Sequence, residues 1–238
     1  MVHKWDHYLD IYDSRFHPFR NKSINFLEIG IMHGGSLKMW QNYFGENLRL
    51  FGIDINPECK KFEENNIQIH IGSQEDTIFL DLVAQKMPQM DIILDDGGHT
   101  MKQQLLTFQH LFPLLKDGGL YIVEDTHTSY WELYGGGLNR NGSFIEFAKR
   151  LIDSMHIHHL NENQKVLKSS NTQNIRSISF YDSMIFFEKG SPIKPFHTRL
   201  GKEQVSPIEI KESKWLGTWR KWLGKSVRSF SQNDRSAN

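Results

Sequence analysis

Two short apolar segments of the chain end in carboxylates followed by a histidine. Residues 92–99 are Ile-Ile-Leu-Asp-Asp-Gly-Gly-His, and residues 120–127 are Leu-Tyr-Ile-Val-Glu-Asp-Thr-His. In an open parallel sheet, the carboxyl ends of neighbouring strands meet at one edge, where ligands bind. If the two segments are neighbouring strands, Asp96, Glu124 and Asp125 converge there and repel one another strongly unless a cation lies between them. The pattern therefore predicts a divalent metal ion bound by these three carboxylates.

Such a site is suited to activating a hydroxyl group. A divalent cation stabilises a developing alkoxide, and a nearby imidazole can remove the proton. Ligation by oxygen alone favours Mg²⁺ over zinc. His99 is the candidate base, with a helix cap or a position in the core as the structural alternative. Asp95 precedes Asp96 on a strand, so its side chain should point to the other face, either toward a cofactor or into the structure.

A second candidate site is the glycine-containing loop after the first predicted strand, residues 28–36 (Glu-Ile-Gly-Ile-Met-His-Gly-Gly-Ser). Glycines allow the backbone to approach a ligand closely. Met32 replaces the second glycine of the nicotinamide fingerprint, which argues against an NAD-dependent oxidoreductase. Glu28 suits a cationic ligand, Asp54 can accept hydrogen bonds from a ribose, and the loop of residues 73–76 can meet an adenine edge. The candidate cofactor-binding residues are Glu28, Gly30, Gly34, Ser36, Asp54, Ser73, Gln74 and Asp95.

Strand and helix patterns alternate along most of the chain, which predicts the scaffold of both sites. Strands are expected over residues 25–31, 48–55, 67–71, 91–95 and 120–124. Helices are expected over residues 37–44, from 57 onward, over 77–87, over 102–115 with a stop at 116–119, and over about 143–155. A tight hairpin is expected from residues 175–180 and 184–188. This succession predicts an α/β fold with a doubly wound, mostly parallel seven-stranded sheet and a C-terminal antiparallel hairpin.

Composition limits the class of protein. The chain has 28 basic and 28 acidic residues, so no net field favours a nucleic-acid partner. Its one cysteine, Cys59, excludes an internal disulfide and fits a reducing compartment. No segment has the apolar length of a membrane span, and the N-terminus lacks a signal sequence. We therefore expect a cytoplasmic protein.

The chain divides into three expected regions. Residues 1–23 form an N-terminal helical segment that should pack on the domain, residues 24–190 form the main domain, and residues 191–238 form a tail. From 211 to 238 the tail has seven basic and two acidic residues, a net charge of +5, and residues 214–230 place tryptophans at helical spacing. Such a helix can associate with an anionic membrane surface, dock on a partner or a second copy of the chain, or pack on its own domain.

The chain resembles class I S-adenosylmethionine-dependent methyltransferases. Residues 28–30 resemble the first motif of that fold, and Asp54 resembles its ribose-binding acid. Residues 94–99 and 123–125 are similar to segments of the metal-dependent macrolide-sugar O-methyltransferases of the macrocin and mycinamicin type, and of the cephalosporin hydroxylase-associated family. The resemblance implies a Rossmann-like methyltransferase fold, S-adenosylmethionine and Mg²⁺ as cofactors, the three carboxylates as metal ligands, and His99 as the base.

The function expected from this resemblance is Mg²⁺-dependent methylation of a hydroxyl on a sugar or glycosylated metabolite. The acceptor is then a small molecule or a glycan. The alternative is a cofactor-binding module without transferase activity, attached to a hydroxylase or another biosynthetic complex. In the loop 128–142, Tyr130, Trp131 and Tyr134 flank the glycines at 135–137. We expect it to cover the site and to stack on a sugar ring.

Overall fold

The residues that the computed structural model describes are 1–163, 174–191, 193–202 and 204–205. Met1–Pro195 form one compact unit, and Phe196–Asn238 form a second. The basic segment predicted at 214–230 lies outside the described residues, so its docking to a membrane, a partner or a second copy stays a prediction. Among the helices that are described, none is long and apolar enough to cross a membrane.

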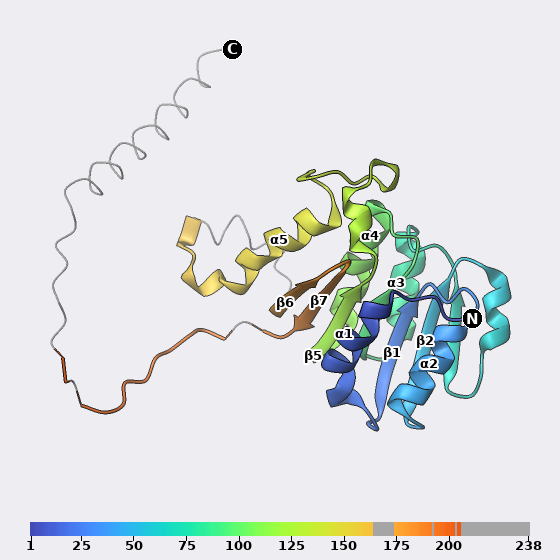
Figure 1. The fold of residues 1–238 in the computed structure, drawn as a ribbon, viewed down its shortest axis with the longest axis horizontal. Helices are drawn as coiled ribbons and strands as arrows, with labels where there is room; N and C mark the ends of the chain where they lie inside the picture. Colours follow the sequence, from blue (N-terminus) through green and yellow to red (C-terminus); the bar gives the residue numbers. More distant parts are fainter. Residues whose placement is uncertain (164–173, 192, 203, 206–238) are drawn as a thin grey trace, which may run out of the picture. The chain divides into compact units, whose positions relative to one another are not determined.

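A seven-stranded sheet forms the centre of the first unit (Figure 1). Its strands are β1 (Ile24–Ile29), β2 (Leu48–Asp54), β3 (Ile67–Ile71), β4 (Met90–Asp95), β5 (Leu115–Val123), β6 (Ile175–Tyr181) and β7 (Met184–Lys189). Their order is β3-β2-β1-β4-β5-β7-β6. The first five strands run parallel, and β7 pairs antiparallel with both β5 and β6. This order confirms the predicted mostly parallel sheet with its C-terminal hairpin.

Helices cover both faces of the sheet. They are α1 (Asp6–Phe16), α2 (Gly35–Phe44), α3 (Thr77–Lys86), α4 (Met101–Leu111) and α5 (Phe144–Met155). One core cluster packs α1 and α2 on the sheet, and the other packs α3, α4 and α5 on the opposite face. Phe26 and Leu27 are successive, fully buried residues of β1 and belong to different clusters. Continuous apolar strands are stable here because both faces are covered.

The chain reverses direction along the sheet at β1. From β1 it winds outward through β2 and β3, and then returns to add β4 and β5 on the other side. The carboxyl ends of β1 and β4 therefore lie next to each other at a topological switch point, where a crevice forms because the two connections leave in opposite directions. The glycine-containing loop follows β1 and the first of the acidic segments follows β4, so both sites predicted from the sequence lie at this crevice.

The predicted helix stop at residues 116–119 is wrong. The helix α4 ends at Leu111, a 3₁₀ helix follows at Phe112–Leu114, and residues 116–119 belong to β5. Pro113 has no backbone N–H and cannot continue an α-helix. Met90 of β4 pairs with Leu115, and Ile92 pairs with Leu120, so residues 116–119 form an irregularity in the ladder.

The helix predicted from residue 57 is only a 3₁₀ helix, Pro57–Phe62. The Asn56 side chain accepts a hydrogen bond from the Glu58 N–H and starts it. It ends after six residues because Glu64 pairs with Ile67 in a β-bridge that turns the chain into β3. Cys59 is buried there, and burial raises the pKa of its thiol to about 11. A buried thiol with a raised pKa is a poor nucleophile, because the thiolate is the reactive form.

Candidate active site

The carboxyl ends of β1, β4 and β5 hold the predicted acidic residues in place. The Asp96 N–H donates to the carbonyl of Ile29 at the end of β1 (3.0 Å), and the Glu124 N–H donates to the carbonyl of Asp95 at the end of β4 (3.0 Å). The ladder thus continues one residue beyond each strand. Asp96, Glu124 and Asp125 follow these strand ends directly, as the sequence predicted.

Asp96, His99 and Asp125 form a compact cluster. Each offers one ligand atom, and these three atoms lie within 4.8 Å of one another. His99 Nε2 is 3.5 Å from Asp125 Oδ2 and 3.9 Å from Asp96 Oδ1. His99 and Asp125 both have positive φ, +59° and +50°. Such a backbone is uncommon for residues other than glycine and often marks a functional position. The donor set of oxygen and nitrogen atoms fits a divalent cation.

Glu124 faces a different partner. Its carboxylate is 1 % exposed and accepts hydrogen bonds from Lys4 Nζ at 2.9 and 3.0 Å and from the Tyr12 hydroxyl. Lys4 Nζ also contacts Asp96 Oδ2 at 2.5 Å. Burial disfavours a charged ammonium, but the attraction of Glu124 and Asp96 outweighs it and raises the pKa of Lys4. Lys4 is therefore a cation held within the acidic site.

The helix α1 supplies two tyrosines to the same site. The Tyr8 hydroxyl donates to Asp125 Oδ1 (2.9 Å) and lies 3.0 Å from the carbonyl of Ser183 in the β6–β7 turn. Tyr12 binds Glu124. The predicted packing of this segment on the domain is present, since Tyr8, Tyr12 and Phe16 are buried. The helix also orients two of the carboxylates, which was not expected from the sequence.

One cleft of about 1000 Å³ connects the acidic cluster with the glycine loop. Of the eight predicted cofactor residues, those that line it are Gly30, Ser36, Asp54, Ser73 and Gln74. Glu28, Gly34 and Asp95 are not among its lining residues. The three acids Asp96, Glu124 and Asp125 and the imidazole of His99 line its other end. A ligand at the glycine loop and a group at the acidic cluster can therefore meet in one cavity.

Gly30 allows the first loop to pass close to the end of β4. Its φ is +88°, and a Cβ at this position would lie 2.1 Å from the carbonyl oxygen of Asp96. Behind the loop, Glu28 is fully buried and accepts a hydrogen bond from Ser36 Oγ (2.8 Å). Burial raises the pKa of Glu28 to about 7.

Asp54 holds the loop in shape from the end of β2. Its Oδ2 accepts the backbone N–H groups of Ile31 (2.8 Å) and Met32 (2.9 Å), and its Oδ1 accepts that of Asn56 (2.8 Å). Burial alone raises the pKa of Asp54, but these backbone hydrogen bonds outweigh burial and lower it. The carboxylate is therefore ionised at the cleft wall, where a ribose hydroxyl could donate to it.

Gln74 has its amide engaged within the protein. Its Nε2 donates to Asp95 Oδ1 (3.3 Å) and Thr107 Oγ1 (3.1 Å), and its Oε1 accepts the Gly98 N–H (2.7 Å). Asp95 is buried behind this amide, and burial raises its pKa to about 7. The amide links the end of β4 to the loop that carries His99. Contact of Gln74 with an adenine edge stays a prediction.

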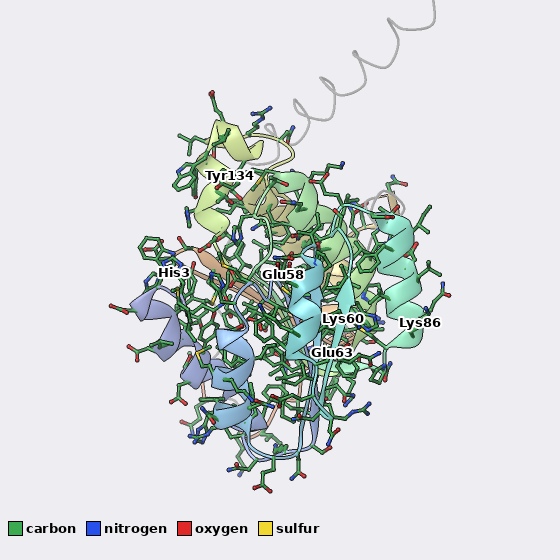
Figure 2. All side chains as sticks on the ribbon, turned by 90° about the vertical axis from the view of Figure 1, so that its right-hand side faces the viewer. His3, Glu58, Lys60, Glu63, Lys86 and Tyr134 are labelled. Atoms are coloured by element: carbon green, nitrogen blue, oxygen red, sulfur yellow. The ribbon has the colours of Figure 1, made fainter. Side chains whose placement is uncertain are left out.

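A smaller cleft of about 250 Å³ lies next to the acidic cluster, and its lining residues are Trp5, His7, His127, Trp131, Asp182 and Ser183. The rings of His127 and Trp131 are 4.7 Å apart, and Trp5 meets His127 edge-on at 6.2 Å. Trp5 and Trp131 are each about half exposed. Of the three aromatic residues expected to cover the site, only Trp131 lines this cleft. Tyr134 lies above His3 in the view of Figure 2.

Sequence reasoning missed Lys4, Tyr8 and Tyr12 as site residues. With Phe16 they are spaced four residues apart, so they share one side of the N-terminal segment. That spacing predicts a buried stripe. The spacing does not predict which strand end the stripe covers, because that depends on how α1 packs on the sheet.

Comparisons with known proteins agree with this architecture. Residues 27–126 match a family described as a methyltransferase domain. Mycinamicin VI 2''-O-methyltransferase of Micromonospora griseorubida is 33 % identical over 189 residues, which is 75 % of this chain and 47 % of that protein. Demethylmacrocin O-methyltransferase of Streptomyces fradiae is also 33 % identical, with the same coverage. The chain thus spans about half the length of the curated relatives it matches.

Solved structures show the same relationship. The structure of the MycE methyltransferase from the mycinamycin biosynthetic pathway, in complex with Mg, SAH and mycinamycin VI, superposes with a TM-score of 0.72 at 29 % identity. The match covers 85 % of this chain and 54 % of that one. The chain therefore contains a methyltransferase domain with the Rossmann-like methyltransferase fold and is related to the macrolide-sugar O-methyltransferases of the mycinamicin and macrocin type.

Proposed function

We propose that this protein is an S-adenosylmethionine-dependent, Mg²⁺-dependent O-methyltransferase that acts on a hydroxyl of a sugar or glycosylated metabolite. The observation that carries the proposal is the single cleft that joins the glycine loop to the cluster of Asp96, His99 and Asp125. The relatives named above support it, since their names describe O-methyltransferases of mycinamicin VI and of demethylmacrocin, and the MycE structure is described with Mg, SAH and mycinamycin VI.

The acidic cluster is where the metal would be held. Asp96 and Asp125 each present an oxygen atom to His99 Nε2, at 3.9 and 3.5 Å, and Glu124 is the third predicted ligand. When bound there, Mg²⁺ would supply a positive charge that makes a neighbouring acceptor hydroxyl more acidic. Tyr8 orients Asp125 by its hydrogen bond to Oδ1, so the oxygen Oδ2 faces His99.

His99 is the proposed base. Its imidazole takes the proton from the acceptor hydroxyl, and the resulting oxygen forms a bond to the methyl carbon as the carbon–sulfur bond breaks. When bound, S-adenosylmethionine would supply that methyl group, and S-adenosylhomocysteine would be the second product. The loop around Gly30 and the carboxylate of Asp54 would hold the donor at the other end of the cleft. The chain thus contributes alignment, which can lower the barrier by roughly 7–11 kcal/mol in well-oriented reactions.

Thermal unfolding in the presence of cofactor tests the donor directly. S-Adenosylmethionine at about a hundredfold excess over its Kd should stabilise the folded state by about 2.7 kcal/mol and raise the unfolding midpoint by several degrees. NAD should leave the midpoint unchanged, since Met32 replaces a fingerprint glycine. A rise with NAD and none with S-adenosylmethionine would contradict the proposal. Methyl transfer from labelled donor to a panel of glycosides then separates an enzyme from a module that only binds the cofactor.

The small aromatic cleft is the proposed acceptor side. Trp131→Ala should raise the KM for a glycoside acceptor about three- to tenfold, since an aromatic contact contributes roughly 0.5–1.5 kcal/mol beyond its area. The kcat and the Kd for S-adenosylmethionine should stay close to wild type, and Trp131→Phe should restore much of the KM. Steady-state kinetics measures these values. An unchanged KM in Trp131→Ala would remove this cleft from the acceptor site.

A further inference from the structure

We propose that Lys4 is a built-in cation of the active site and that it competes with the divalent ion for Asp96 and Glu124. The proposal rests on the metal site of the function proposed above. Lys4 Nζ is 2.5 Å from Asp96 Oδ2 and 2.9 and 3.0 Å from the two oxygens of Glu124. Its side chain is 5 % exposed. Its ammonium is thus bound by two of the three carboxylates predicted to bind the metal.

The ammonium contacts carboxylate oxygens of two predicted metal ligands, Asp96 and Glu124. Both oxygens of Glu124 and one oxygen of Asp96 point at Lys4 Nζ, and the Tyr12 hydroxyl donates to Glu124 as well. Two cations bound to the same carboxylate oxygens in a buried site repel each other strongly. A divalent ion that takes Asp96 and Glu124 as ligands must therefore displace Lys4 from them. Asp125 is free of this competition because it contacts Tyr8 and His99 instead.

Lys4 compensates the negative charge of the acidic site when no metal ion is bound. Asp96, Glu124 and Asp125 bring three carboxylates to one edge of the sheet, and leaving buried carboxylates unpaired is costly. The ammonium of Lys4 pairs with two of them, Asp96 and Glu124. The site can therefore fold before metal arrives, and the ion then exchanges with an ammonium that is already there.

Lys4 is placed on a segment that can move without unfolding a helix. Residues 1–5 precede α1, which begins at Asp6. The segment also forms a wall of the large cleft, whose lining includes Met1, Val2 and His3. Next to it, a Cβ at Gly35 would lie 2.1 Å from the carbonyl oxygen of Met1, so the segment lies against the start of α2. Release of Lys4 by the metal therefore shifts a wall of the cofactor cleft.

Magnesium binding to a lysine variant tests the competition. Lys4→Met keeps the length of the side chain and removes its charge. We expect Mg²⁺ to bind Lys4→Met at least tenfold more tightly than wild type in calorimetric titration. The metal-free variant should unfold several degrees lower and gain more from Mg²⁺. The matched control Lys38→Met removes an exposed lysine that pairs with Glu64 at 3.0 Å and should bind Mg²⁺ as wild type does. Equal or weaker binding by Lys4→Met would overturn the proposal.

Chemical labelling of the wild-type protein tests it without a variant. Acetylation of lysines by an amine-reactive reagent, followed by peptide mass spectrometry, should find Lys4 protected without metal. Saturating Mg²⁺ should increase its labelling rate at least tenfold, with a midpoint at the Mg²⁺ Kd. Lys60, whose side chain is 52 % exposed and which is marked in Figure 2, should react equally in both conditions.

The outcomes separate this inference from the proposed function. Saturable Mg²⁺ binding with Lys4 still protected overturns the competition alone. No saturable Mg²⁺ binding in wild type or Lys4→Met overturns both the competition and the metal mechanism. Metal-dependent exposure of Lys4 without methyl transfer to any glycoside supports the competition and counts against the proposed function.

Discussion

Replacing Asp125 with alanine is expected to abolish metal-stimulated methyl transfer. Asp125 is half of the Asp96–Asp125 pair around His99, and its Oδ2 is 3.5 Å from the imidazole. Without it the cluster loses an oxygen ligand and the neighbour of the proposed base. We expect kcat to fall by at least about two to three orders of magnitude, the range found when a group that stabilises transition-state charge is removed. A radiolabelled methyl-transfer assay with and without added Mg²⁺ measures the loss.

Cofactor binding should survive this substitution. Gly30 and Asp54 lie at the other end of the cleft, and the hydrogen bonds of Asp54 to Ile31 and Met32 do not involve Asp125. The Kd for S-adenosylmethionine should therefore change little. Asp117→Ala is the matched control. Asp117 is an exposed carboxylate near the start of β5, the strand whose other end precedes Asp125. Full activity of Asp125→Ala in the presence of a chelator would disprove the metal mechanism.

The second large effect is expected at His99. His99→Gln keeps a polar side chain of similar reach and removes the base, so kcat should fall by about 10²- to 10⁴-fold. Steady-state kinetics of methyl transfer by both proteins measures this loss. His110→Gln, which changes a histidine paired with Asp81 on the surface, should behave as wild type.

Magnesium affinity decides between two roles for His99. Its Nε2 is near enough to Asp96 and Asp125 to serve as a metal ligand as well as a base. As a base, His99→Gln should lower kcat and leave the Mg²⁺ Kd close to wild type. A loss of Mg²⁺ affinity that matches the loss of activity would instead make His99 a ligand, and the proton would need another acceptor.

Local sequence patterns were enough to predict the scaffold. Apolar segments that alternate with amphipathic ones predicted the sheet and its hairpin, because burial on both faces requires continuous apolar strands. They were less reliable where tertiary contacts compete with local signals. Residues 116–119 look like a helix stop, yet they join β5, where the Lys116 ammonium pairs with Asp91 at 2.7 Å. Pro57 looks like a helix start, yet the bridge from Glu64 to Ile67 ends that turn early.

The candidate site, too, could be predicted from the sequence only in part. Asp96, Glu124 and Asp125 could be placed at one edge because parallel strands deliver their carboxyl ends to the same side. The partners of each carboxylate could not be predicted, since Lys4 and Tyr12 are more than a hundred residues from Glu124 in sequence. Gln74 was predicted at the cleft and lines it, but its amide links Asp95 to Gly98. Such links depend on which side chains the fold brings into reach.

The sequence by itself determined which chemical groups lie at the strand ends, because strand periodicity shows where each strand stops. It also determined that these groups share one edge of the sheet, because the alternation of strands and helices along the chain predicts parallel strands. Only the tertiary structure decided how those groups are paired: Asp125 with Tyr8 and His99, and Glu124 with Lys4 and Tyr12. The reason is that a buried carboxylate must find a partner wherever packing supplies one. Here packing supplied it from the first residues of the chain.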